Sequence, residues 1–195
     1  MSTNSSAHEL LAPSEWVCRF VHLIRERGRA ADVACGHGRH ARHLRDCGLS
    51  VVAIDRDAEA LASMHGLDRI ETVMADLEQG PWPFPPGTFD AVVVTNYLWR
   101  PLISDLIAGL REGGVLIYET FAVGNERYGR PANPDFLLRR NELLERVAPQ
   151  LQVVAFEQGV VSHPKPAVVQ RICAVRAGDG WAPLVAPQGA AGRGL

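Results

Sequence analysis

The sequence predicts an α/β protein with an open, mostly parallel sheet and helices on both of its faces. Short apolar runs alternate with helical patterns over residues 13 to 176. A turn with two glycines, Cys35-Gly36-His37-Gly38, joins the first apolar run to the next helical pattern. The run FDAVVVT, Phe89–Thr95, has the continuous apolar character of a strand that is buried on both faces. In such sheets ligands bind at the carboxyl ends of the strands.

The expected elements follow each other in a βαβαβ…βαβαββ order. Asp57 is the expected N-cap of a short helix, and glycines at 48 and at 113–114 are expected to end two others. A proline-rich connector, residues 79–87, offers Trp82 and Phe84 for packing. The expected strands are 31–35, 50–54, 70–75, 89–95, 115–121, 151–161 and 170–176, and the expected helices are 13–28, 39–47, 57–64, 102–110 and 136–147.

The length of 195 residues predicts one domain, over residues 13–176. Residues 1–12 are expected to form a disordered arm, and residues 177–195, rich in Gly, Ala and Pro, a loose tail.

Composition excludes several classes of partner. With 47% hydrophobic residues and a net charge of −2, the chain has no bulk attraction to nucleic acid or to a membrane surface. No apolar run approaches the ~20 residues of a membrane span. Residues 1–13 lack a signal peptide, and the four scattered cysteines form no C-x-x-C pair. We therefore expect a cytoplasmic protein with reduced thiols that acts on a small molecule, whereas its oligomeric state stays open.

The turn at 35–38 has the features of a ligand site. Gly36 and Gly38 allow positive φ and have no Cβ that would obstruct a ligand. The turn also fits the loose dinucleotide pattern G-x-G-x-x-G/A, so NAD is one alternative. A P-loop is excluded because no G-K-[ST] is present.

Polar residues close successive strands: Asp55, Asp76, Asn96 and Glu119. We expect them to share one edge of the sheet. Asp55 lies 17 residues after Gly38, within reach of the ribose hydroxyls of a nucleoside above the turn. Asp55 and Asp76 could instead be simple N-caps.

These residues resemble the class I S-adenosylmethionine-dependent methyltransferases. The resemblance covers residues 30–176 and rests on Asp32 to Gly38, then Asp55, then Ala75-Asp76-Leu77. The run DVACGHGRHARHL is most similar to the small tellurite-resistance and thiopurine-type methyltransferases. The resemblance implies a Rossmann-like sheet of seven strands, with the last strand, 170–176, antiparallel, and S-adenosylmethionine as the cofactor.

The resemblance also implies contacts to the cofactor. Gly36 and Gly38 would approach its methionine part, Asp55 its ribose, and Asp76 its adenine amino group. A second acid suits an adenine amino group, whereas a pyrophosphate would gain nothing from it, so NAD becomes the weaker alternative. The implied cofactor-binding residues are Asp32, Cys35, Gly36, Gly38, Arg39, Asp55, Arg56, Asp76, Leu77 and Asn96.

The loop over residues 122–135 is long enough to suggest a function. It places Arg127, Tyr128 and Arg130 close together, as a lid that recognises an anionic or planar substrate. Trp99 and Arg100 are further candidates for substrate contact. Alternatively, the arginines pair with nearby acids: Glu119, Glu126 or Asp135.

A sulfonium methyl donor carries its own activation, so a base is needed only for a protonated nucleophile. The candidate catalytic bases are Glu119, Tyr97 and His163. Glu119 could equally be a solvated charge or a partner of Arg100 or Arg130. A thiolate or a reduced chalcogen oxyanion would need no base.

Three other hypotheses stay open. Cys35, His37, His40 and His43 include metal-binding types, but the tetrahedral zinc spacings are absent, so no metal is predicted. A methyltransferase could act on RNA, although no basic or aromatic stacking motif supports this. A cofactor-binding module without catalysis could use exposed Trp16, Trp82 and Trp181 as an interface. Trp16 would also be the contact if the N-terminal helix closes over the cofactor.

Overall fold

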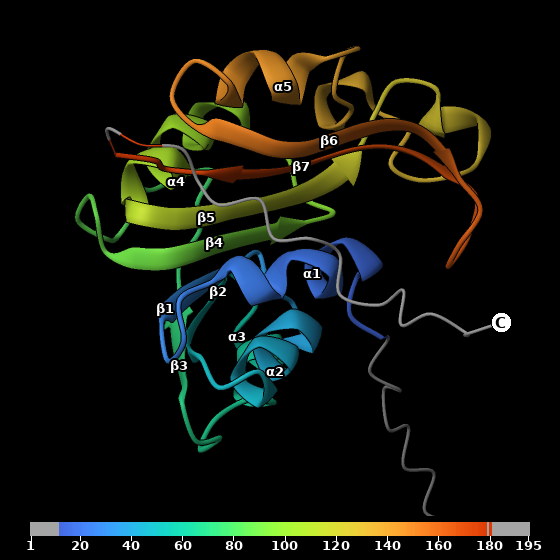
Figure 1. The fold of residues 1–195 in the computed structure, drawn as a ribbon. Helices are drawn as coiled ribbons and strands as arrows, with labels where there is room; N and C mark the ends of the chain where they lie inside the picture. The colour runs from blue at the N-terminus through green and yellow to red at the C-terminus, as the bar shows by residue number, and fades with distance from the viewer. Residues whose placement is uncertain (1–11, 179, 181–195) are drawn as a thin grey trace, which may run out of the picture.

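The computed structural model describes residues 12–178 and 180. Its centre is a sheet of seven strands in the order β3-β2-β1-β4-β5-β7-β6 (Figure 1). The strands are β1 Arg29–Val33, β2 Ser50–Asp55, β3 Ile70–Met74, β4 Phe89–Thr95, β5 Leu110–Phe121, β6 Gln152–Val161 and β7 Ala167–Val175. The α-helices are α1 Glu15–Phe20, α2 Arg39–Asp46, α3 Ala58–Ala62, α4 Ile103–Gly109 and α5 Glu142–Val147, and the 3₁₀ turns are η1 Val21–Leu23, η2 Arg100–Leu102, η3 Asn125–Arg127 and η4 Pro134–Phe136.

The topology confirms the predicted fold class. Strands β1 to β5 pair in parallel, and β7 is antiparallel to both β5 and β6. The antiparallel seventh strand implied by the resemblance is therefore present. Strand β1 lies between β2 and β4, and such a reversal of strand order opens a crevice at the carboxyl ends.

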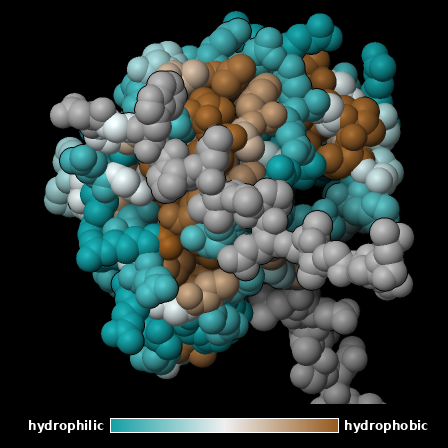
Figure 2. All heavy atoms as spheres, viewed as in Figure 1, coloured by the Kyte–Doolittle hydropathy of each residue, from teal (hydrophilic) through white to brown (hydrophobic). Residues whose placement is uncertain are grey.

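Helices cover both faces of the sheet (Figure 1). Trp16 of α1 and Leu44 of α2 belong to one buried cluster, with the side chains of one sheet face. Leu106 of α4 and Leu143 of α5 belong to the other. Every residue of β4 is buried, as its apolar sequence predicts. Figure 2 shows an apolar band across the middle of one side of the molecule, bordered by hydrophilic surface.

Two helix starts follow local capping rules. The Asp57 carboxylate accepts hydrogen bonds from the Glu59 and Ala60 amides, which confirms Asp57 as the N-cap of α3. The Ser14 hydroxyl caps α1 by accepting from the Trp16 amide. That helix is shorter than the predicted 13–28, because the backbone turns extended at Ile24 after η1.

Two predicted helix boundaries, the end of α4 and the start of α5, were wrong. Helix α4 ends at Gly109, and Gly113 and Gly114 lie inside β5, because Leu110 already pairs with Phe89 of β4. Helix α5 begins only at Glu142 instead of residue 136. Residues 137–139 run extended beside the end of β5, where the Leu138 amide donates to the Phe121 carbonyl at 3.0 Å.

Trp16 and Trp82 pack against the core instead of forming an exposed interface. Trp82 and Phe84 lie edge-on to each other and to Phe89 of β4, with ring centroids 5.0 to 6.2 Å apart. Trp16 is only 1% exposed. Trp181, the arm over residues 1–11 and most of the tail lie outside the described residues.

Within the described part of the chain, every helix is too short or too polar to cross a membrane.

Candidate active site

The carboxyl ends of β1 to β4 surround a cavity of about 150 Å³. The two predicted acids, Asp55 after β2 and Asp76 after β3, line it together with Tyr97 after β4. Of the four polar residues expected at this edge, Asp55 and Asp76 therefore share one cavity, whereas Asn96 and Glu119 are not part of its lining. The complete lining is Ala34, Asp55, Arg56, Ala75, Asp76, Leu77, Glu78 and Tyr97.

Asp55 organises the glycine turn. Its Oδ2 accepts from the Gly36 amide at 2.7 Å, and its Oδ1 accepts from the Asp57 amide at 3.0 Å. Each oxygen keeps a further lone pair for a hydroxyl donor. Gly36 has a φ of +52°, and a Cβ there would meet nothing within 4 Å. The turn is thus open to a ligand at Gly36.

Gly38 is glycine for a different reason. It has a φ of +76° as the N-cap of α2, and a Cβ there would collide with the Met64 sulfur. Its missing side chain makes room for Met64, so packing alone accounts for this glycine.

Asp32 connects β1 to α2. It is 1% exposed, and its Oδ2 accepts from the Ala41 amide at 2.8 Å. Burial raises the pKa of Asp32 to about 7, although the Ala41 hydrogen bond and Arg39 act in the opposite direction. Arg39 itself donates to the Ala12 carbonyl at 3.4 Å.

One of the two carboxylate oxygens of Asp76 is hydrogen-bonded within the turn that follows β3. Its Oδ1 accepts from the Glu78 amide at 3.0 Å, and its Oδ2 lies 4.0 Å from Arg56 Nη1. Leu77 beside it is 7% exposed. Asp76 therefore forms a local turn instead of capping a helix, and it faces the same cavity as Asp55.

Asn96 and Tyr97 form the wall after β4. Asn96 adopts the left-handed conformation, with a φ of +56°, and its amide donates to the Glu119 carbonyl at 2.9 Å. Burial, and secondarily the nearby Glu78 charge, raise the pKa of the Tyr97 phenol above its usual range. Tyr97 therefore stays protonated at neutral pH. Burial likewise raises the pKa of the Cys35 thiol.

Glu119 has partners that the sequence did not indicate. Its Oε1 accepts from the Ser14 hydroxyl at 2.8 Å, and its Oε2 pairs with Arg171 at 3.2 Å. Arg171 also pairs with Glu157 on β6. The expected partners Arg100 and Arg130 are not involved.

His40 on α2 is a structural residue of this edge, whereas the sequence indicated either a metal-binding residue type or an ordinary helix residue. It is 2% exposed. Nε2 accepts from the Ser14 amide at 3.1 Å, so Nδ1 carries the proton toward Thr95 Oγ1, 3.2 Å away. Burial lowers the pKa of His40 to about 3, assisted by the Arg39 charge. Among the described residues no group of three or more His, Cys, Asp or Glu is placed to hold a metal ion.

Arg100 has a different place from the predicted substrate contact. Its guanidinium donates to both oxygens of Glu142, at 2.7 and 3.0 Å, and to the Asp135 and Leu137 carbonyls. Glu142 is 1% exposed and also pairs with Arg146. Arg100 thus fastens residues 135–142 to the start of α4. Trp99, next to it, packs against the core on the α4–α5 face.

The loop after β5 is anchored at its base and exposed at its tip. The Asn125 side chain bonds the Pro131 carbonyl and the Val168 amide. Arg127, Tyr128 and Arg130 are exposed, and no ion pair joins these arginines to a described residue. His163, the third candidate base, is exposed in the β6–β7 hairpin and contacts Ser162.

Comparisons with known proteins agree with this geometry. Residues 30–114 match a family model described as a methyltransferase domain. TehB from Haemophilus influenzae is 17% identical with a TM-score of 0.69, over 82% of this chain and 61% of TehB. A SAM-dependent methyltransferase from Methanosarcina mazei is 16% identical with a TM-score of 0.66, over 86% of this chain and 99% of the other. The [4+2]-cyclase SpnF is 17% identical with a TM-score of 0.65, over 83% of this chain and 78% of SpnF. No curated protein matches the sequence.

The strand order and the structural matches define a Rossmann-like methyltransferase fold. Its fold is that of class I S-adenosylmethionine-dependent methyltransferases, and residues 30–114 carry the match to a methyltransferase domain. The open turn at Gly36 and the two acids of the cavity fit an adenosyl group. The chain spans about three fifths of the length of TehB.

Proposed function

We propose that the enzyme transfers a methyl group from S-adenosylmethionine to a small-molecule acceptor of the thiol or oxyanion type. The observation that carries this proposal is the cavity at the carboxyl ends of β1 to β4, which Asp55, Asp76 and Tyr97 line beside the open turn at Gly36. When bound, the cofactor supplies a sulfonium-activated methyl group.

Different residues of the cavity would contact different groups of the adenosyl part of the cofactor. Asp55 would accept from the ribose hydroxyls while it holds the Gly36 amide, and Asp76 would accept from the adenine amino group. Leu77, which lines the cavity beside Asp76, would meet the ring through its amide. These acceptors would provide selectivity because each one matches a donor of the adenosyl group.

The state of the candidate bases favours an acceptor that arrives ionised. The Tyr97 phenol stays protonated, and both Glu119 oxygens already have donors. We infer that the enzyme aligns the nucleophile with the methyl group and excludes water, and that it does not abstract a proton. A thiolate or a reduced chalcogen oxyanion meets this requirement, in line with the resemblance to tellurite-resistance and thiopurine-type methyltransferases.

The loop after β5 would recognise the acceptor's charge. Arg127 and Arg130 are exposed and without ion-pair partners among the described residues, so they are available to an anion. We place the reaction in the cytoplasm because all four cysteines are free thiols.

The first test measures thermal shifts with S-adenosylmethionine, S-adenosylhomocysteine and NADH at equal concentration. A ligand at ~100 times its Kd stabilises by ~2.7 kcal/mol, which moves Tm by a few degrees. We expect shifts with the two adenosyl compounds only. Asp55→Ala should abolish them, whereas Asp57→Ser, which keeps the cap of α3, should not. A shift with NADH alone would contradict the proposal.

The second test is transfer of a labelled methyl group to a panel of thiols and oxyanions. SpnF shows that this fold also occurs in a [4+2]-cyclase. Tight binding of S-adenosylmethionine with no product from any acceptor would favour a role without methyl transfer.

A further inference from the structure

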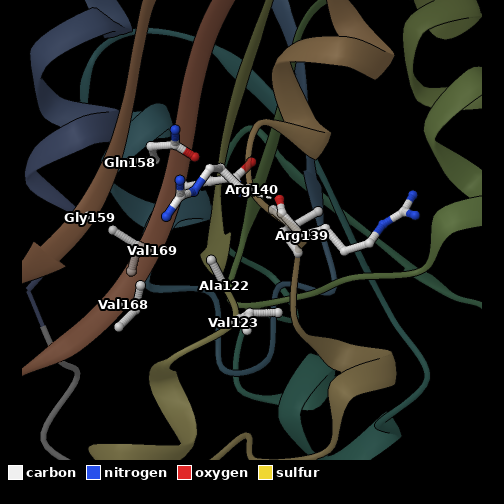
Figure 3. Close-up of a pocket in the computed structure, with 10 residues that line it drawn as sticks. Ala122, Val123, Arg139, Arg140, Gln158, Gly159, Val168 and Val169 are labelled. Atoms are coloured by element: carbon white, nitrogen blue, oxygen red, sulfur yellow. Dashed lines mark hydrogen bonds between the residues drawn. The ribbon is translucent and has the colours of Figure 1, made fainter.

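A second hollow lies beyond the end of β5, on the α5 side of the sheet (Figure 3). Its volume is about 580 Å³, within the range of small-molecule sites. Four stretches of chain enclose it: residues 122–123 after β5, residues 138–140 before α5, and parts of β6 and β7. We call this hollow, lined by residues 122–123, 138–140, 158–159 and 168–170, the Arg140 pocket.

The walls of the Arg140 pocket are held together before any ligand binds. The Ala122 amide donates to the Val168 carbonyl at 2.9 Å, and the Val123 amide donates to the Leu138 carbonyl at 3.0 Å. On the far side, the Asn141 amide donates to Gln158 Oε1 at 3.1 Å. The pocket is therefore preformed, which lowers the entropy cost of binding.

Most polar side chains of the lining are already satisfied. Gln170 is fully buried, and its amide bonds the Arg139 carbonyl and the Leu143 amide. Gln158 exchanges hydrogen bonds with Asn141. These groups have no need of a ligand.

Arg140 is the exception. Figure 3 shows its side chain reaching across the hollow toward Gln158, whereas that of Arg139 points the opposite way. Arg139 Nε lies 3.5 Å from Glu142. Arg140 has no ion pair or hydrogen bond from its guanidinium to any described residue. A free guanidinium beside apolar walls formed by Val123, Val168 and Val169 suits a ligand with an apolar body and a planar anion.

The pocket is also close to the reaction edge. Ala122 lies three residues along the chain from Glu119, whose carbonyl holds the Asn96 amide. At about 3.3 Å per residue this separation is about 10 Å. An elongated molecule can thus reach from the pocket to the end of β4.

We propose that the Arg140 pocket binds the acceptor through a carboxylate or similar planar anion at one end of an apolar chain, so that the nucleophile at the other end reaches the methyl group. The proposal of an acceptor rests on the proposed function, whereas the pocket's affinity for such an anion does not.

Binding is tested without catalysis, by calorimetric titration of hexanoate and its neutral analogue hexanamide into the full-length protein. Hexanoate should bind more tightly than hexanamide. Arg140→Gln should weaken hexanoate at least fivefold and leave hexanamide unchanged. Arg139→Gln removes the same charge from the neighbouring side chain and should leave hexanoate within twofold. Val123→Trp, which fills the pocket from an exposed position, should weaken both compounds.

Undetectable hexanoate binding to the wild type, or equal losses in the two arginine variants, would overturn the proposal. Transfer is then compared for 6-mercaptohexanoate and hexanethiol. Arg140→Gln should raise KM at least fivefold for the acid only, with kcat and the affinity for S-adenosylmethionine unchanged. Equal KM changes for both thiols would refute the acceptor role. If neither thiol nor any panel acceptor is methylated while hexanoate binding still depends on Arg140, the site stands and the proposed function fails.

Discussion

The Ser14 hydroxyl donates to Glu119 Oε1 at 2.8 Å, between residues 105 positions apart in the sequence. The Ser14 amide donates to His40 Nε2, and the hydroxyl oxygen also caps α1. One serine thus ties the N-terminal segment to α2 and to the end of β5, beside the proposed site of reaction. Trp16, the contact expected for closure over the cofactor, instead bonds the Ile172 carbonyl on β7.

Substitution of Ser14 separates its two roles. Ser14→Ala removes the cap and the Glu119 bond and should lower the free energy of unfolding by about 1–2 kcal/mol. Ser14→Asp keeps a capping oxygen but places a carboxylate against Glu119. If the Glu119 bond matters, the aspartate variant is at least as unstable as the alanine variant in urea denaturation. If Ser14→Asp is as stable as the wild type, only the cap of α1 contributes to the free energy of unfolding, and the Glu119 bond does not.

The two glycines of the turn should respond differently to alanine. Gly38→Ala combines a positive φ with a collision against Met64 and should destabilise the fold by more than about 2 kcal/mol. Gly36→Ala adds strain of about 1 kcal/mol but meets no protein atom. It should instead weaken S-adenosylmethionine binding more than tenfold. Denaturation and cofactor titration of both variants check this, and equal stability losses would contradict it.

Because of the Arg100–Glu142 pair, we expect the free energy of unfolding to fall at low pH. Burial alone would raise the pKa of Glu142, but hydrogen bonds from the side chains of Arg100 and Arg146 and from the Arg139 backbone amide outweigh it and hold the pKa at about 2. Because the pKa of Glu142 in the folded protein lies below its ordinary value of 4.5, this stabilisation is present above pH 4.5 and is lost as the pH falls toward 2.

Arg100→Ala leaves a buried carboxylate with fewer partners and should cost about 3 kcal/mol at pH 7. The deficit relative to wild type should shrink between pH 4.5 and pH 2. Arg139→Ala, which removes a contact of 3.5 Å from a side chain that is 75% exposed, is the matched control and should cost little. A deficit that does not change with pH would contradict the assigned role of the pair.

His40 predicts a second pH dependence, in a different range. Burial holds the pKa of His40 at about 3 in the folded protein, below its ordinary value of 6.5. Below pH 6.5 His40 binds a proton in the unfolded chain but stays neutral in the folded protein. The free energy of unfolding of the wild type therefore falls by up to about 1.4 kcal/mol per pH unit because of this residue. His40→Gln should be less stable than wild type by about 1–2 kcal/mol at pH 8, because two hydrogen bonds weaken.

The difference in free energy of unfolding between wild type and His40→Gln should shrink or reverse by pH 5.5, because glutamine does not titrate. Urea denaturation of both at pH 8 and pH 5.5 measures it, and Asp32 contributes equally to both proteins. A constant difference would mean that His40 is protonated in the fold.

Local patterns in the sequence predicted much of this protein. The seven strands, the cap at Asp57 and the acids at the strand ends follow from short-range periodicity and turn chemistry, and Phe89–Thr95 has the predicted bounds. Parallel order alone brings the carboxyl ends of β1 to β4 together, which is why Asp55 and Asp76 line one cavity.

Tertiary structure alone decided which partners the charged residues have. Glu119 on β5 pairs with Arg171 on β7, and Arg100 pairs with Glu142, 42 positions away in the sequence. The local sequence around the many arginines does not distinguish which of them pairs with which acid. The extended stretch at 137–139 replaced a predicted helix because a hydrogen-bonding edge beside β5 was available to it. Propensity and periodicity act over a few residues, whereas hydrogen-bond partners depend on the order and direction of strands that are far apart in the chain.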